Sequence, residues 1–409
     1  MHEARVRARA RALPPAFLKE IARPDLDAKT THAAIAGLIV LRMVDRWVAG
    51  GCRPVDVEGA RKAVEEMDAG NAGRNALGLV LVGLSSDGVD RRDEVIRHLI
   101  AYARSLEFDA KWAMAIAVYH AVVDALGVAS SERAACDAWL RRGFCLRMLG
   151  ELPEAEVAYA RAYETASALG DSERALRAEG GSVLVDIARG NLDEVDARLE
   201  ELIARAHGAG LDAVRATFLH DRAVIAGMRG SPARAAVGLA FEALELTTDP
   251  SERDRILFDT GEALRAAGMR DPARDAFLIL SCTARERQVR WHAAIMLMRI
   301  AADDGRPDMF DDYSNSIDVA VLPPQLHIEY LLQSGYSRRR FGDNPGAAAR
   351  FSEAIALAEA QGQTNQLREA KRAASGVSDA AETPDPETTA GLDAVVNALR
   401  LMRESTVSV

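Results

Sequence analysis

The sequence predicts an all-α protein built as a solenoid of stacked antiparallel helix pairs. Two observations carry this prediction: marker glycines that recur about every 40 residues, and helix-capping signals that share their phase. The frame G-x-x-x-R-x-x-G occurs over residues 143–150, 261–268 and 335–342. Its second glycine begins a series at intervals of 40, 40, 38, 37 and 37 residues, through Gly150, Gly190, Gly230, Gly268, Gly305 and Gly342. A steady period of this kind indicates units that stack on one another.

The residues around each marker glycine predict a helix, a tight turn and a second helix. Apolar residues with helical spacing precede the marker, as at Trp139, Leu146 and Leu149. Glycine ends a helix in the left-handed conformation, and proline suits the first turn of the next one. A proline follows five of the six markers: Pro153, Pro232, Pro272, Pro307 and Pro345. Ser-Glu-Arg begins at Ser131, Ser172 and Ser251, where serine or a neighbouring aspartate can cap the first helix.

Together these residues resemble the tetratricopeptide repeat (TPR) family, in its branch with longer repeats. The resemblance covers residues 91–370 and implies a right-handed superhelix of helix pairs. Small residues at Gly143 and Ala155 would let two helices approach closely, and Tyr159 would fill the space against the next pair. The unit of Gly305 departs most, because residues 308–318 lack the small-residue pattern of a second helix. The matching positions are Trp139, Gly143, Leu146, Gly150, Ala155, Tyr159 and Ala162; Gly261, Gly268, Ala273 and Phe277; and Gly335, Gly342, Ala347, Phe351 and Ala354.

The flanks of the repeats are predicted to be helical as well. Residues 95–105 and 111–126 form one further helix pair, which opens the solenoid of residues 91–370. Residues 1–90 form an N-terminal helical region of degenerate repeats or a cap, with helices over 30–47, 55–67 and 75–84. Residues 371–391 are polar and acidic and are expected to form a flexible linker. Residues 392–404 then carry an amphipathic stripe that predicts a C-terminal helix.

Composition and charge exclude several classes of function. The net charge is −10, so a general nucleic-acid surface is not expected, because such affinity comes from clustered Lys and Arg. The longest apolar stretch, residues 33–41, is too short to span a membrane, and no secretion signal is expected. Four cysteines without a C-x-x-C pair suggest neither a zinc site nor a disulfide framework. We therefore expect a cytoplasmic, bacterial protein that binds no membrane.

Catalytic motifs are absent from the sequence, which predicts a protein that is not an enzyme and needs no cofactor. Neither a phosphate-binding loop, a dinucleotide fingerprint, a zinc-protease motif nor a nucleophile elbow occurs. The acidic stretch over residues 303–315 superficially suggests a divalent-metal site, but its first half fits no ligand spacing, and we interpret it as a solvated acidic turn. No two of the eight histidines lie three or four residues apart, so no metal site is expected.

The resemblance places the binding site on the first helix of each pair, which lines the concave face in this family. Arg147, Arg265 and Arg339 share one position in three units, and arginine binds carboxylates well. The implied partner is therefore a protein or peptide bound in a groove, and an acidic peptide is the natural hypothesis. A simpler interpretation is that arginine occurs there for helix propensity alone. The groove residues are Phe144, Arg147, Met148, His220, Phe258, Arg265, Tyr336, Arg339 and Arg340, with Met228 and Glu262 beside them.

The most probable function from the sequence is a non-enzymatic scaffold for protein recognition. The alternative is a bacterial regulatory or sensor module whose superhelix responds to a peptide or small ligand. In that case the C-terminal helix could occupy the groove arginines until it is displaced. Two further alternatives are a helical enzyme that uses Asp311 and Asn315, and DNA binding by the arginine-rich residues 5–11.

Overall fold

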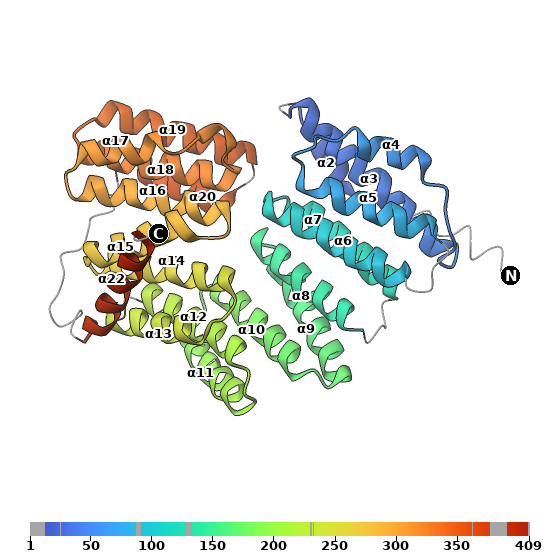
Figure 1. Cartoon of the computed structure of the whole chain (residues 1–409), viewed down its shortest axis with the longest axis horizontal. Coiled ribbons are helices and arrows are strands. Elements are labelled where there is room, and N and C mark those ends of the chain that lie inside the picture. The colour runs from blue at the N-terminus through green and yellow to red at the C-terminus, as the bar shows by residue number, and fades with distance from the viewer. Residues whose placement is uncertain are drawn as a thin grey trace. The chain divides into compact units, whose positions relative to one another are not determined.

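The computed structural model describes residues 13–24, 26–86, 91–127, 132–229, 231, 233–361, 363–376 and 391–407. Throughout these residues the only regular elements are α-helices and one 3-10 turn, which confirms the all-α prediction (Figure 1). The chain divides into two compact units, Met1–Asn191 and Leu192–Val409, called the first and second units below. No helix within the described ranges is long and apolar enough to cross a lipid bilayer.

The first unit is a succession of helices in which each packs on the next along the chain. The predicted segments 30–47 and 75–84 form α3 and α5, and 55–67 contains the shorter α4. Helix α2 was not predicted, because its seven residues are too few to show a period, although Phe17 is completely buried. The helices are α2 (Pro15–Ile21), α3 (Ala28–Ala49), α4 (Glu58–Glu65), α5 (Ala72–Ser85), α6 (Arg91–Phe108), α7 (Trp112–Leu126), α8 (Arg133–Met148), α9 (Leu152–Leu169) and α10 (Ser172–Arg189).

The second unit continues the pattern of paired helices and ends in one further helix. A helix over the predicted C-terminal stripe is present as α22. The elements are α11 (Leu192–Gly208), α12 (Asp212–Met228), α13 (Ala233–Leu246), α14 (Pro250–Ala266), α15 (Arg270–Thr283), α16 (Arg287–Asp303), α17 (Pro307–Asn315), η1 (Val319–Val321), α18 (Pro324–Arg340), α19 (Asn344–Gln361), α20 (Thr364–Ala374) and α22 (Asp393–Val407). Helix α20 overlaps the start of the predicted linker, and residues 377–390 lie outside the described residues.

The turns between paired helices form at the marker glycines, as predicted. Gly150, Gly190, Gly268, Gly305 and Gly342 all have positive φ, between 67° and 88°, in the left-handed region that glycine adopts without strain. Gly230 and Pro232, the markers of the remaining unit, lie outside the described residues, as does the capping residue Ser131.

Aspartates cap the first helices, which resolves the choice that the Ser-Glu-Arg signal left open. Asp171 accepts a hydrogen bond from the backbone N–H of Arg174, and Asp249 accepts one from Glu252. The N-terminal N–H groups of α10 and α14 are therefore partly satisfied by side chains of the preceding residue.

In three of the helix pairs an aromatic ring lies against a glycine of the facing helix. A Cβ atom added to Gly143 would lie 2.8 Å from the ring of Tyr159, and one added to Gly261 would lie 2.9 Å from Phe277. The third pair repeats this with Gly335 and Phe351. The matching alanines Ala155, Ala273 and Ala347 are buried at the same level. This repeated packing of small against large residues is what the TPR resemblance implied.

Two features depart from a regular array, and both lie in the second unit. Helix α17 has only nine residues, in agreement with the missing small-residue pattern after Gly305. Helix α22 packs on α15, the second helix of its pair, and buries Leu392, Val395 and Leu399 in the same apolar core (Figure 1). The suggestion that α22 occupies the predicted groove is therefore wrong, since the groove residues lie on first helices.

Candidate functional site

In the first unit, the predicted residues of α8 form one cation–aromatic cluster. The guanidinium of Arg147 lies 5.5 Å from the centroid of the Phe144 ring, and Arg141 stacks on the same ring at 4.5 Å. The Phe144 ring in turn meets the edge of Trp112 at 5.6 Å. Such contacts contribute about 0.5–1 kcal/mol each at exposed sites. Met148, at the end of the helix, remains 39% exposed.

In the second unit, the predicted arginines already have partners within the protein. Arg265 forms an ion pair with Glu262, one turn earlier on α14, with Nε 3.1 Å from Oε1. Arg339 donates to the carbonyl oxygen of Ala373 at 2.9 Å and stacks over Phe351. Arg340 lies 2.8 Å from a carboxylate oxygen of Asp303. Each guanidinium therefore already has a hydrogen-bond or ion-pair partner within the protein.

Two further predicted residues, His220 and Tyr336, are buried. His220 on α12 is 3% exposed, and its Nε2 lies 2.6 Å from Oδ2 of Asp259 on α14. Tyr336 on α18 is 9% exposed and packs edge-on against Phe351. Phe258 is half-buried and lies between the rings of Phe277 and His292. Met228, by contrast, is 57% exposed at the end of α12.

Polar side chains follow one face of the first helices in the second unit. Glu262, Arg299 and Tyr336 each lie six residues before a marker glycine: Gly268, Gly305 and Gly342. His292 and Glu329 lie thirteen residues before the last two of these glycines. Residues at the same distance from equivalent turns occupy equivalent positions on α14, α16 and α18. We call the polar row the set His220, Asp259, Glu262, Arg265, His292, Arg299, Glu329 and Gln333.

The sequence analysis missed five members of the polar row: Asp259, His292, Arg299, Glu329 and Gln333. The unit of Gly305 matches the repeat pattern poorly, so its first helix supplied no candidates. The register of the marker glycines nevertheless contained the signal, because counting back from Gly305 gives His292 and Arg299 directly.

Hydrogen bonds and ring contacts join the polar row from helix to helix. The rings of Phe258 and His292 lie 4.1 Å apart between α14 and α16. Arg299 Nη1 donates to the side-chain oxygen of Gln333 between α16 and α18. Gln333 in turn donates through Nε2 to Oε1 of Glu329 at 2.7 Å. Arg299 is also paired with Asp303, and both side chains are 1% exposed.

Burial shifts the proton affinities of two groups in the row. Burial raises the pKa of Glu329, and the negative charge of Glu262 raises it further, whereas Gln333, Arg299 and Arg265 oppose the shift. Burial lowers the pKa of His292 against the opposing effect of Glu262 and Asp259, so its ring is neutral at pH 7. Within the described part of the chain, Glu329 takes part in no ion pair, and its carboxyl group is bonded only to a neutral amide.

Other titratable clusters are satisfied internally. In the first unit, Glu107 accepts hydrogen bonds from Tyr119 and Arg141, and these groups join α6, α7 and α8. Burial raises the pKa of the nearby Cys145 and raises that of Cys136 to about 11, so both thiols are protonated at neutral pH.

Arginine neutralises the aspartates in the first half of the acidic stretch that suggested a metal site. Asp304 pairs with Arg274 and Arg270, and Asp308 pairs with Arg306. In the ranges that the structure describes, no three His, Cys, Asp or Glu side chains form a group that could hold a metal ion.

The chain is similar to solved structures of peptide complexes, although no family model and no curated protein matches it. One is the Rap conjugation gene regulator of the plasmid pLS20 in complex with the Phr* peptide, with a TM-score of 0.53 and 11% identity over 83% of this chain and 97% of that chain. Another is a Rap protein complexed with competence and sporulation factor, with a TM-score of 0.52 and 9% identity over 83% of this chain and 99% of that chain. The shared feature is the fold.

The fold and the comparisons define the class of this protein. Helix pairs with left-handed glycine turns and repeated ring-on-glycine packing make the chain an all-α solenoid of the TPR type. The members of the polar row lie on first helices of the second unit, α12, α14, α16 and α18.

Proposed function

We propose that the chain is a non-enzymatic regulatory protein that binds a peptide or a partner protein through the polar row of its second unit. The observation that carries this proposal is Glu329, a half-buried carboxyl group on a first helix that is bonded to the neutral amide of Gln333 and takes part in no ion pair among the described residues. Burying a charge without a partner costs stability, so a group of this kind is more often retained for binding than for folding. The two similar Rap structures, which hold a peptide and a competence factor, support this reading.

The charge of the ligand is a separate part of the proposal. The sequence favours an acidic peptide held by Arg147, Arg265 and Arg339, but Glu262 already neutralises Arg265. A cationic group of the ligand would instead relieve the repulsion between Glu329 and Glu262. We therefore propose that the ligand brings at least one positive charge to Glu329, with the acidic peptide as the alternative.

Peptide binding tests both versions. Two fluorescent peptide pools, one with a fixed arginine and one with a fixed glutamate, are titrated with the full chain and followed by fluorescence anisotropy. The variant Glu329→Gln should weaken binding of the cationic pool about tenfold, which is the loss of one charge-assisted contact. Glu353→Gln is the matched control, since Glu353 lies exposed on α19 and pairs with Arg350.

The alternative gives the opposite pattern. If the acidic pool binds and Arg265→Gln abolishes that binding, the ligand is acidic and the proposed role of Glu329 is wrong. If neither pool binds the full chain, the polar row is no peptide site. The contact of Phe144, Arg147 and Met148 with a partner is a further proposal for the first unit, and Arg147→Glu tests it in the same assay.

A sensor function, in which a ligand alters the solenoid and releases an output partner, is the second proposal. It does not depend on the C-terminal helix in the groove, because α22 packs on α15. A small-angle scattering profile that changes when the peptide binds would support it, and an unchanged profile would favour a static scaffold.

A further inference from the structure

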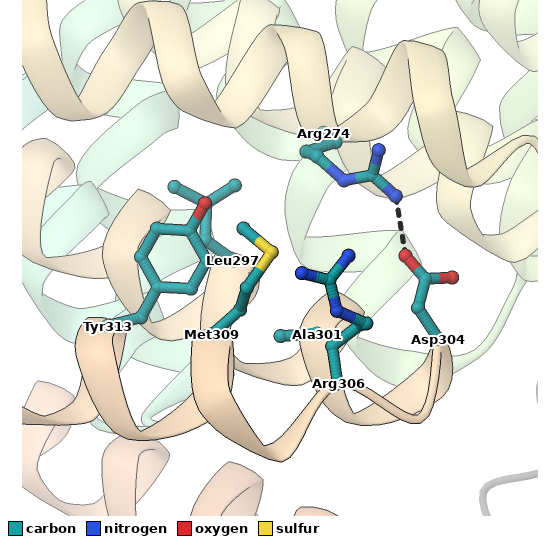
Figure 2. A pocket seen from close by; sticks show the side chains of 7 residues that line it. All are labelled: Arg274, Leu297, Ala301, Asp304, Arg306, Met309 and Tyr313. Carbon is teal, nitrogen blue, oxygen red and sulfur yellow. Dashed lines mark hydrogen bonds and ion pairs between the residues drawn. The ribbon is translucent and has the colours of Figure 1, made fainter.

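The second unit contains a pocket where its helical array is least regular (Figure 2). The pocket lies between α15, α16 and α17, and α17 has only nine residues. Its cavity volume is about 230 Å³. It is lined by Arg274, Leu297, Ala301, Asp304, Arg306, Met309 and Tyr313. None of these residues belongs to the polar row.

Charged groups gather at one end of the pocket (Figure 2). Arg274 reaches in from α15 and pairs with Asp304, which directly follows α16. Arg306, which precedes α17, faces Arg274 across the pocket and is held by the exposed Asp308 through Nε and Nη2. The lining therefore carries two positive charges and one negative charge. The carboxylates of Asp308, which pairs with Arg306, and of Asp271, which pairs with Arg274, lie outside the lining and are 65% and 86% exposed, so solvent screens their charge.

The other end of the pocket is apolar (Figure 2). Leu297 and Ala301 on α16 form its floor, and the side chains of Met309 and Tyr313 on α17 lie beside them. Burial raises the pKa of Tyr313, so its hydroxyl stays protonated and available as a hydrogen-bond donor. A cavity of about 150 Å³ lined by apolar side chains holds a benzene molecule, so this larger pocket has room for about eight non-hydrogen atoms.

We propose that this pocket binds a small monocarboxylic acid with a branched or straight apolar chain. The carboxylate would lie between the guanidinium groups of Arg274 and Arg306, where it balances the excess positive charge of the lining. The chain would cover Leu297, Ala301 and Met309 and remove their surface from water. This ligand site is separate from the peptide site, and its failure would leave the proposed peptide binding untouched.

Three related probes of one shape test the chemistry of the ligand. The probes are 4-methylpentanoate, its uncharged amide 4-methylpentanamide, and L-leucine, which adds an ammonium group to the acid. Each is titrated into the full chain by isothermal titration calorimetry and checked by the shift in melting temperature. We expect saturable binding of the acid, at least about tenfold weaker binding of the amide, and weaker binding of leucine because its ammonium group meets two arginines.

Matched variants connect the binding to the pocket. Arg306→Gln should weaken the acid about fivefold or more, with little effect on folding because its side chain is 55% exposed. The control Arg255→Gln changes an equally exposed arginine on α14 that pairs with Glu252 outside the pocket. It should bind the acid as the unchanged protein does.

The proposal is overturned by any of four results. The first is that the acid shows no saturable binding at millimolar concentration. The second is that the amide binds as well as the acid, and the third is that Arg306→Gln leaves the affinity for the acid unchanged. Tighter binding of leucine than of the acid would also overturn it, because Asp304 would then be the residue that selects the ligand, and the class would be amino acids.

Discussion

Replacing Gly143 by alanine tests the ring-on-glycine packing that three of the helix pairs share. The added Cβ would lie 2.8 to 2.9 Å from three atoms of the Tyr159 ring, closer than carbon atoms pack. The same ring also lies against Gly181 on α10, so it has no free side toward which to move. Overpacking of this kind costs about 1–3 kcal/mol. The gain in helix propensity from glycine to alanine offsets about 1 kcal/mol of that cost.

Gly78 provides a control within the same unit. It lies on α5, and a Cβ added there would meet no atom within 4 Å, so Gly78→Ala should stabilise the first unit by about 1 kcal/mol. Chemical denaturation followed by circular dichroism should thus separate Gly143→Ala from Gly78→Ala by about 1–3 kcal/mol. The double change Gly143→Ala with Tyr159→Leu should recover part of the loss. Equal stabilities for the two single variants would show that the ring and the glycine are not in contact.

Three other changes have outcomes that follow from the structure. Gly150→Val should destabilise the first unit by about 1–2 kcal/mol in urea unfolding, because a β-branched residue resists its φ of 77°; no loss would mean that the turn is misplaced. Leu399→Ala, at a fully buried position of α22, should cost the second unit about 2–5 kcal/mol in thermal unfolding, whereas a docked but dispensable helix would cost nothing. Because the folded state raises the pKa of Glu329 above its usual 4.5, folding takes up a proton, and the stability of the unchanged protein relative to Glu329→Gln should rise as pH falls from 7.5 toward 4.5. A stability difference that does not vary over this pH range would contradict that reasoning.

Helix pairs and their turns were predictable because their signals are local. The left-handed φ at Gly150 and the buried Ala155 follow from residue chemistry within one unit, and both were read from the repeat. The residues after Gly305, which lack the small-residue pattern of a second helix, likewise indicated that α17 would be irregular. Helix α2 was missed, because a seven-residue segment carries too few positions for a period to be recognised.

The helices that carry the candidate residues could be read from the sequence, but the contacts of those residues could not. The register from the marker glycines placed Phe258, Glu262 and Arg265 on a first helix, where the structure has them. It could not reveal that Arg265 is paired with Glu262 or that Arg340 is paired with Asp303. The residue type of an arginine does not indicate whether its guanidinium has a partner in the folded protein. Glu329 stands out only once the structure shows that its carboxyl group is half-buried and bonded to the amide of Gln333.

The amino-acid sequence by itself determined the helices, the places where they turn and the size of each repeated unit, because glycine conformation, capping and apolar spacing act over a few residues. The tertiary structure alone decided which charges neutralise one another and where the last helix packs. Arg403 pairs with Asp275, 128 residues earlier in the chain, and Arg299 bonds to Gln333 on another helix. Contacts of that kind depend on how helices distant in sequence meet, and no local pattern records them.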